Sequence, residues 1–302
     1  MPEDARQTVE SPVAVITEGL LSRFTREFAR MPWLVVLCCL FILTMLFIAL
    51  FAPALAPQHY ADLDLINRLK PPAFLGGPPR YLLGTDELGR DILSRLFYAT
   101  RISIFVAIAG TLIGAVIGTF FGFAAAHLRG LAEEAIMMFV DAQASMPFMI
   151  IALAVLAFFG NSFWLFVFIM GINGWENYAR LSRGMVLAAK SHGYVVAIRS
   201  LGARPPRLYF RHVLPNIASV LIVQFTLNFP STILLETSLS FLGLGIQPPL
   251  TSLGLMLGSG RNYLLLAWWL AVFAGSMIFL TTLSVSILGD WLRDRLDPTL
   301  RR

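Results

Sequence analysis

Charged residues are scarce in this chain, and their scarcity is the first guide to its class. Aspartate, glutamate, lysine and arginine make up 14% of the 302 residues, whereas they make up about a quarter of a soluble domain. Hydrophobic residues make up 57%, and the mean hydropathy is +0.73. So little charge excludes a soluble globular protein, and we predict an integral membrane protein.

Cysteine and histidine are also rare. The chain has two cysteines, Cys38 and Cys39, which are adjacent in an apolar stretch and cannot form an ordinary disulfide with each other. We expect them to act as small packing residues. The four histidines are scattered without the spacing of metal ligands, so no metal site is predicted.

Enzyme motifs are missing as well. The sequence contains neither HExxH nor GxSxG, and Gly289–Asp290 lacks the preceding glycine of a GxGD intramembrane protease. Residues 184–191 resemble a phosphate loop, but Ala189 replaces the second glycine and the surroundings are helical rather than a strand followed by a turn. We therefore predict no catalytic residue and no cofactor bound by this chain, which has no visible means of using ATP itself.

Six apolar segments come close to or exceed the ~20 residues that a membrane-spanning helix needs. We therefore predict an all-α membrane protein with six transmembrane helices. The fourth segment is the weakest candidate, because Asn173 and Glu176 interrupt its end. The segments cover residues 33–54, 102–126, 135–159, 163–178, 217–239 and 264–288.

Lysine and arginine set the predicted orientation. They are more frequent in the segments on the side of the N-terminus than in those on the other side, so the positive-inside rule places both termini in the cytoplasm. Residues 1–32 form a cytoplasmic tail in which apolar side chains recur once per helical turn, typical of an interfacial helix; a frayed amphipathic tail is the alternative. Residues 33–101 hold the first span and an external loop. Residues 102–290 are the permeation core with a cytoplasmic loop at 190–216, and 291–302 are a cytoplasmic tail.

The end of the external loop, residues 84–101, has the pattern of an amphipathic helix on the outer surface. Thr85 is expected to cap its first turn, because a threonine hydroxyl accepts the free N–H groups there. Asp91 and Arg95 have the spacing of an ion pair along one helix face. This helix would lead directly into the second span.

The second span carries four glycines at intervals of four residues, which places them on one face of the helix. Without side chains on that face, another helix can approach closely. We therefore predict a tight seam with a neighbouring helix, of this chain or of a partner subunit. The four residues are Gly110, Gly114, Gly118 and Gly122.

Polar residues and prolines occur inside the third and fifth segments. Ionisable groups at membrane depth are costly and usually face a cavity or a partner, and prolines there free backbone carbonyls. These residues either border a translocation path or only hold the helices together by hydrogen bonds, and the sequence leaves both readings open. The residues are Asp141, Pro147, Gln224, Asn228 and Glu236.

Residues 194–216, YVVAIRSLGARPPRLYFRHVLPN, form what we name the basic hairpin. The segment carries four arginines and has the periodicity of two short helices joined at Gly202–Ala203. A plain connection between two spans needs only a few residues. A folded, basic element facing the cytoplasm is typical of a docking surface for a soluble partner.

The basic hairpin resembles the EAA loop of ABC-importer permeases. Gly202 and Pro215 are thirteen residues apart as in that pattern, and Ala197 and the Leu214–Pro215 ending also match. Residues 82–104, 238–249 and 288–298 are similar to the dipeptide/oligopeptide permease family, of the type encoded second in such operons. The resemblance covers nearly the whole chain.

The resemblance implies the permease fold of a type I ABC importer in the bacterial cytoplasmic (inner) membrane. Its partners would be a homologous second permease, two cytoplasmic ABC ATPase subunits that bind ATP and Mg²⁺, an extracytoplasmic solute-binding protein and membrane lipid, with no nucleic acid. The hairpin would couple to an ATPase subunit through a helix at 194–201. The implied coupling residues are Tyr194, Val195, Val196, Ala197, Ile198, Arg199, Leu201, Gly202, Ala203 and Pro215.

The sequence departs from the family pattern in several places, two of them in the hairpin. Val196 stands where the family has a glutamate and Ile198 where it has a second alanine, so an apolar face docks instead, or Arg199 takes over a polar contact or sits at the lipid headgroups. The solute is expected to be a di- or oligopeptide, with nickel chelates and glutathione as alternatives. A secondary, ion-coupled transporter is the competing function, although Asp141 and Glu236 are few for that role.

Overall fold

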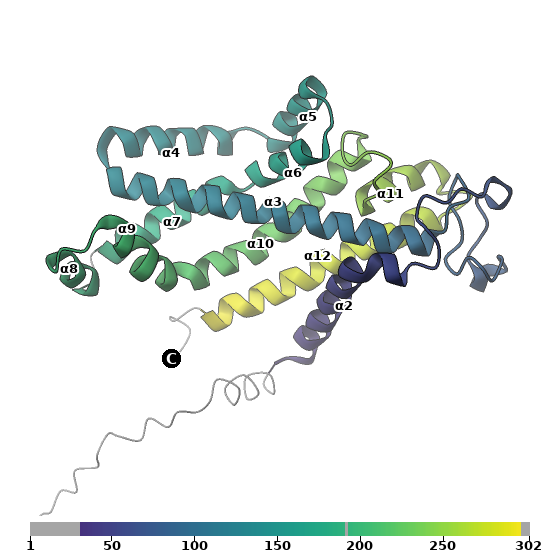
Figure 1. The fold of residues 1–302 in the computed structure, drawn as a ribbon, viewed down its shortest axis with the longest axis horizontal. Coiled ribbons are helices and arrows are strands. Elements are labelled where there is room, and N and C mark those ends of the chain that lie inside the picture. Colours follow the sequence, from purple (N-terminus) through teal and green to yellow (C-terminus); the bar gives the residue numbers. More distant parts are fainter. Residues whose placement is uncertain (1–30, 191–192, 297–302) are drawn as a thin grey trace, which may run out of the picture.

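The computed structural model describes residues 31–190 and 193–296, except the side chains of residues 194, 196, 197 and 199. The predicted N-terminal interfacial helix and the last six residues lie outside this part. Within it the chain is helical, with a single isolated bridge between Thr85 and Asp91 and no longer strand (Figure 1).

Four long helices build the frame. They are α2 (Trp33–Leu55), α3 (Ile92–Leu128), α10 (Leu214–Phe241) and α12 (Trp269–Leu296). Figure 1 shows α3 and α12 running from the external loop towards α8 (Gly193–Ser200) and α9 (Pro205–Leu208), whereas α10 runs back. The short helix α11 (Leu253–Gly260) packs between α10 and α12.

The main apolar core lies between α3, α10, α11 and α12 near the external loop. Buried side chains from all four helices meet there, among them Ile92, Ile233, Leu253 and Trp269. Helix α2 packs on α3 and α12 but buries only five residues and leaves large apolar side chains exposed, as expected of a helix that faces lipid.

The predicted third span is not straight. It consists of α4 (Gly130–Ser145) and α5 (Phe148–Phe159), which are bent by 89° at Met146–Pro147. Met146 has an extended backbone (φ −98°, ψ 137°), because the ring of the following proline disfavours the helical conformation before it. The proline that we expected inside a span therefore ends one helix and begins another.

The predicted fourth span is also interrupted. Helix α6 (Phe163–Ile172) ends with Asn173 as its cap. Helix α7 (Trp175–Lys190) begins after Gly174, whose φ is 83°. In the described residues four helical segments are long and apolar enough to cross a membrane singly, and the bent α4–α5 pair makes a fifth. Helices thus occur in all six predicted segments, but the third and fourth are each broken in two, and the sixth becomes helical only at Trp269. The helices of the fourth segment are each too short to be counted as a span.

The outer helix begins later than predicted. Thr85 to Gly89 form a turn, and α3 starts at Ile92 with Asp91 as its cap: the Asp91 carboxylate accepts the backbone N–H of Ser94 at 2.8 Å. The prediction of Thr85 as the cap was wrong because Asp86 folds the preceding residues into a turn, by accepting the N–H groups of Leu88 and Arg90 at 2.8 and 2.9 Å. Arg95 correspondingly pairs with Asp86 rather than with Asp91.

From Ile92 onward the outer helix and the second span are one helix of 37 residues, so α3 crosses the boundary that we drew at residue 101. The remaining short elements are 3-10 turns at Leu65–Asn67, Ala73–Leu75 and Arg261–Tyr263. The first two belong to the external loop, which is held on the bundle by backbone hydrogen bonds such as Ile92 N–H to Gly84 O at 3.1 Å.

Candidate functional site

The basic hairpin is folded as two helices with a glycine corner. Helix α8 ends at Ser200, Gly202 has φ 77°, and the N–H of Ala203 bonds to the carbonyl of Ile198 at 3.3 Å. No heavy atom lies within 4 Å of the position that a Cβ on Gly202 would take. Glycine is therefore required here by the left-handed backbone of a helix end and not by lack of space.

The root of the hairpin is packed into the bundle. Val195 of α8 is fully buried, and Leu208, Tyr209 and Val213 join it in one apolar cluster. The cluster includes Ala126 at the end of α3 and residues of α7. Because its root is buried against two helices, the hairpin is held rigidly to the bundle.

The tip of the hairpin is exposed. Leu201 is 86% exposed, although it is a large apolar residue. Beside it lies a cavity of about 560 Å³ that Gly202, Arg204, Arg207 and others line. An exposed apolar side chain next to arginines is a surface suited to a protein partner with an apolar groove and acidic rim.

The fold buries some of the predicted coupling residues and leaves others exposed. Val195 and, in part, Ile198 turn towards the bundle, whereas Leu201 and Gly202 face away from it and Ala203 is partly exposed. The side chains of Tyr194, Val196, Ala197 and Arg199 lie outside the described part of the chain. Which sides of α8 turn inward depends on α3 and α7, which the hairpin sequence alone does not reveal.

Pro215 lies inside a continuous helical segment and does not begin a separate helix. Helix α9, the π-helical turn Tyr209–Val213 and α10 follow one another as one helical segment of 37 residues. The N–H of Leu214 bonds to the carbonyl of Tyr209 in the wider π pattern, and this turn directly precedes Pro215, which has no N–H to offer. The hairpin therefore leads into α10 without a loop.

The glycine seam lies within this chain. A Cβ on Gly118 would lie 2.2 Å from the carbonyl oxygen of Trp175, and one on Gly122 would lie 2.4 Å from that of Ala179. A Cβ on Gly114 would lie 2.8 Å from the carbonyl oxygen of Gly171, and one on Gly110 would lie 2.9 Å from the Cβ of Met170. Along this seam α3 and the α6–α7 pair touch backbone to backbone.

The five predicted pathway residues lie in different surroundings. Asp141 is exposed on α4, with its carboxylate 3.6 Å from Nε of Arg180. Asn228 is buried beside Gly174, and its amide donates to the carbonyl of Asn173 at 3.4 Å. Gln224 is half-buried one turn before it, and Pro147 lies at the bend between α4 and α5. A role of these residues in a pathway stays a prediction.

Glu236 is buried where α10 meets α3 and α11. It accepts hydrogen bonds from Ser240 at 2.8 Å and from Ser103 at 3.4 Å, and Ser103 accepts the N–H of Leu253 at 3.0 Å. These contacts join three helices. A role of Glu236 in a pathway stays a prediction.

Gln143 is a polar contact that sequence reasoning missed. Its amide donates to the carbonyl of Ile172 at 2.9 Å and accepts the indole N–H of Trp175 at 2.6 Å. It thereby ties α4 to both sides of the break between α6 and α7. A polar side chain in an apolar segment, two residues after Asp141, was the available signal.

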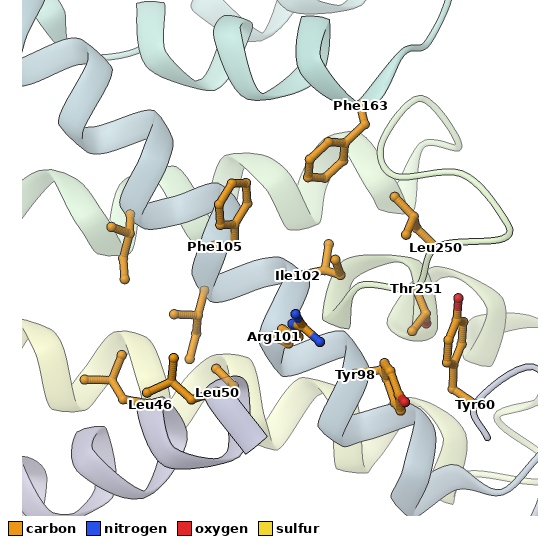
Figure 2. Close-up of a pocket in the computed structure, with 13 residues that line it drawn as sticks. Leu46, Leu50, Tyr60, Tyr98, Arg101, Ile102, Phe105, Phe163, Leu250 and Thr251 are labelled. Atoms are coloured by element: carbon orange, nitrogen blue, oxygen red, sulfur yellow. The ribbon is translucent and has the colours of Figure 1, made fainter. Parts of the chain in front are cut away.

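A further cavity of about 710 Å³ lies at the outer end of the bundle, between α2, α3 and the start of α6 (Figure 2). Its walls are mostly apolar, with Phe105 and Phe163 on one side (Figure 2). Arg101 is the charged residue among them, and the rings of Tyr60 and Tyr98 stand 4.5 Å apart at its outer end. None of the predicted pathway residues lines this cavity.

Comparison with known proteins covers both the first span and the core. The family described as binding-protein-dependent transport system inner membrane component matches residues 114–302. The N-terminal TM domain of oligopeptide transport permease C matches residues 20–72.

Individual relatives extend over most of the chain. The di/tripeptide transport system permease protein DppC of Pseudomonas aeruginosa is 41% identical over 87% of both chains. The glutathione transport system permease protein GsiD of Pectobacterium atrosepticum is 38% identical over 92% of this chain and 91% of that protein. The dipeptide transport system permease protein DppC of Bacillus subtilis is 36% identical over 98% of this chain and 89% of that protein. The matched regions contain the basic hairpin, the glycine seam and the external loop.

Proposed function

The chain belongs to the binding-protein-dependent transport system inner membrane components, the permeases of ABC importers, and from this premise we propose that it imports short peptides. It is a multi-pass membrane permease of the oligopeptide permease C type. Membership in this family argues against the competing function of an ion-coupled secondary transporter.

Short peptides are the solutes that the relatives have in common. The names of the relatives specify di- and tripeptides, dipeptides and glutathione, and glutathione is itself a tripeptide. We therefore assign a di- or oligopeptide to this importer, with glutathione and nickel chelates as the alternatives. Uptake of labelled dialanine, glutathione and a nickel–histidine chelate into cells that express the whole importer distinguishes them: uptake of the chelate alone contradicts a peptide substrate.

The assembled importer would contain a homologous second permease, two cytoplasmic ATPase subunits that bind ATP and Mg²⁺, and an extracytoplasmic solute-binding protein. The single observation that supports this assembly best is the basic hairpin, with its buried root and its exposed tip at Leu201. The hairpin end of the molecule and both termini would face the cytoplasm, since arginines gather in the hairpin and at the end of α12.

Coupling would proceed through rigid contacts. Closure of the ATPase subunits around ATP displaces the tip of the hairpin, and its buried root carries the displacement to α3 and α7. The π-helical turn passes it to α10 directly. ATP can shift the permease between inward-open and outward-open states only if the ATPases bind the hairpin differently in the two.

The Gly202→Asp variant tests the coupling role. Side chains are strained at φ 77°, and an aspartate would also place a charge at the tip of the hairpin. We expect ATP-driven peptide uptake by proteoliposomes that contain the whole importer to fall about tenfold, while the subunit still inserts into the membrane.

Gly76→Asp is the matched control, because Gly76 has φ 88°, is also without neighbours within 4 Å of its Cβ position, and lies in the external loop. Equal losses in both variants would mean that backbone strain alone is responsible. Peptide uptake by liposomes that hold the permeases without any ATPase would contradict the importer itself.

A further inference from the structure

Two cavities adjoin each other where α3 ends beside the basic hairpin. One is a groove of about 840 Å³ between the second half of α3 and the segment that runs from α9 into α10. The other is a pocket of about 370 Å³ beyond the end of α3. They share His127, Pro205 and Tyr209 as lining residues, so the groove and the pocket lie side by side.

The groove is apolar along its length. Val116 and Phe120 of α3 are 62% and 65% exposed and form one wall, and Leu214 and Leu221 of α10 belong to the other. Both walls come from helical segments long and apolar enough to cross the membrane. Apolar side chains exposed on such helices suit contact with hydrocarbon, so the groove suits an acyl chain.

The pocket is basic. Lys190 lines it and donates through Nζ to the carbonyl of Ala126 in the last turn of α3. Arg129 follows directly after the helix end, with φ 53° and an exposed side chain, and makes no ion pair with any residue that the structure describes. His127 is fixed beside it, with Nδ1 3.0 Å from the hydroxyl of Tyr209.

No carboxylate lines either cavity among the residues that the structure describes. The acidic residue of α4 closest in sequence to Arg129, Glu133, is engaged by Arg183 at 2.6 Å. A basic pocket that continues into an apolar groove between membrane helices is complementary to one class of molecule: a negatively charged headgroup that carries acyl chains.

We propose that an anionic phospholipid of the leaflet on the hairpin side occupies this site. Its phosphate lies in the pocket with Arg129 and Lys190, and its chains lie in the groove along Val116 and Phe120. The lipid then fills the space between the end of α3 and the start of α9, at the root of the basic hairpin. The binding of the lipid does not depend on the proposed function. An effect of the lipid on transport rests on the proposed coupling through the hairpin.

Photolabelling of the whole importer tests the binding. The importer is placed in nanodiscs of phosphatidylcholine with a small fraction of a diazirine-bearing lipid, either phosphatidylglycerol or phosphatidylcholine. We expect phosphatidylglycerol to label residues 115–124 and 205–221 about fivefold more than phosphatidylcholine. Equal labelling by the two lipids would overturn the proposal.

Variants locate the site. Arg129→Gln should reduce the phosphatidylglycerol label to the level of phosphatidylcholine, and because Arg129 is exposed the fold should be kept. Arg293→Gln is the matched control: it removes the same charge from an exposed position on α12, at the same end of the molecule. Ala124→Trp, which fills the groove without changing charge, should also abolish the preference. Retention of the preference in Arg129→Gln and in Ala124→Trp would refute the site.

Two other occupants are separate outcomes of the same test. Full competition by millimolar inorganic phosphate would indicate a site for a free anion and overturn the lipid. Cross-linking of a cysteine at Val116 to the second permease, with no lipid label, would indicate a subunit interface and overturn it as well. The label requires no transport, so labelled but inactive importer would contradict the proposed function and leave the lipid site standing.

Discussion

The carboxylate of Asp86 holds the external loop together. It is fully buried, accepts two backbone N–H groups of its own turn and pairs with Arg90 at 2.6 Å and with Arg95. Arg95 is itself 96% buried, as only 4% of its surface is exposed. Removing one partner of a buried pair leaves the other charge without compensation, which costs more than the pair contributes.

We expect Asp86→Ala to lower the free energy of unfolding by about 3–5 kcal/mol. Asp86→Asn should lower the free energy of unfolding by less, because the amide oxygen of asparagine can still accept the two backbone N–H groups. Thermal unfolding of the purified subunit in detergent measures both. Asp62→Asn is the control, since Asp62 is exposed and accepts one long bond, from the N–H of His59 at 3.3 Å. A loss for Asp86→Ala no larger than that of the control would show that Asp86 does not hold the loop.

A second carboxylate of the loop should respond to pH. Hydrogen bonds from Asn67 and Tyr81 lower the pKa of Asp64 below its ordinary value of 3.8, and the Tyr81 hydroxyl lies 2.8 Å from Asp64 Oδ2. The ionised form is favoured in the fold, so its stabilisation is present above the ordinary pKa and is lost as the pH falls through the lowered one.

We therefore expect the loop to become more sensitive to an acid-stable protease such as pepsin as the pH falls through the lowered pKa of Asp64. Tyr81→Phe should weaken the pH dependence, because one of the bonds that favours the carboxylate is gone. Digestion measured at several pH values, relative to an unfolded substrate, provides the comparison. An unchanged pH dependence in Tyr81→Phe would contradict this role of the hydroxyl.

Among the helix–helix contacts that the structure describes, the contact of α3 with α6 and α7 brings glycines closest to the backbone of a neighbouring helix. At Gly118 even a methyl group would stand 2.2 Å from a backbone oxygen, which cannot move without its helix. Gly118→Ala should therefore push α7 away from α3 and lower the free energy of unfolding by about 1–3 kcal/mol.

Gly184→Ala provides the matched control for this seam. Gly184 lies inside α7, is exposed and has no heavy atom within 4 Å of its Cβ position. Alanine favours a helix more than glycine does, so this variant should be unchanged or stabilised by up to about 1 kcal/mol. Denaturation of the two variants in the same detergent tests the contrast, and similar values for both would refute the seam as a steric contact.

Element boundaries were the least predictable part of the fold. Hydropathy predicts the long helices, because a membrane demands an apolar surface over a fixed length. It does not distinguish a straight span from α4–α5 or from the α6–α7 pair, because hydropathy is averaged over a window and says nothing of the backbone at the few polar residues beside each break. The signals were local, Met146–Pro147 and Asn173–Gly174, and a proline or glycine in a membrane helix is often tolerated without a break.

The candidate site was likewise predictable from the sequence only in part. The glycine corner of the hairpin followed from sequence, because only the local backbone decides it. The inward turn of Val195, the continuity of the hairpin with α10 and the partners of Asn228 depend on residues far away in the chain. Spacing within a segment contains no information on such contacts.

At the scale of the whole molecule, α3 connects the two surfaces that other proteins would touch. Its first turn is capped inside the external loop, and its last turn packs against the root of the basic hairpin. Between them, the glycine face lies on α6 and α7 and the opposite face, with Val116 and Phe120, is exposed. The resemblance in sequence indicated the class of the molecule, but only the fold reveals that one helix spans it from end to end.

The π-helical turn has a consequence for how the bundle can move. It joins the hairpin to α10 as one helical segment, so in the proposed coupling a push on the hairpin would act on α10 as on the arm of a lever. The buried contact of Asn228 with Gly174, at the break between α6 and α7, would then be the place where α10 turns. A stroke at the hairpin would move the far end of α10 in the opposite direction.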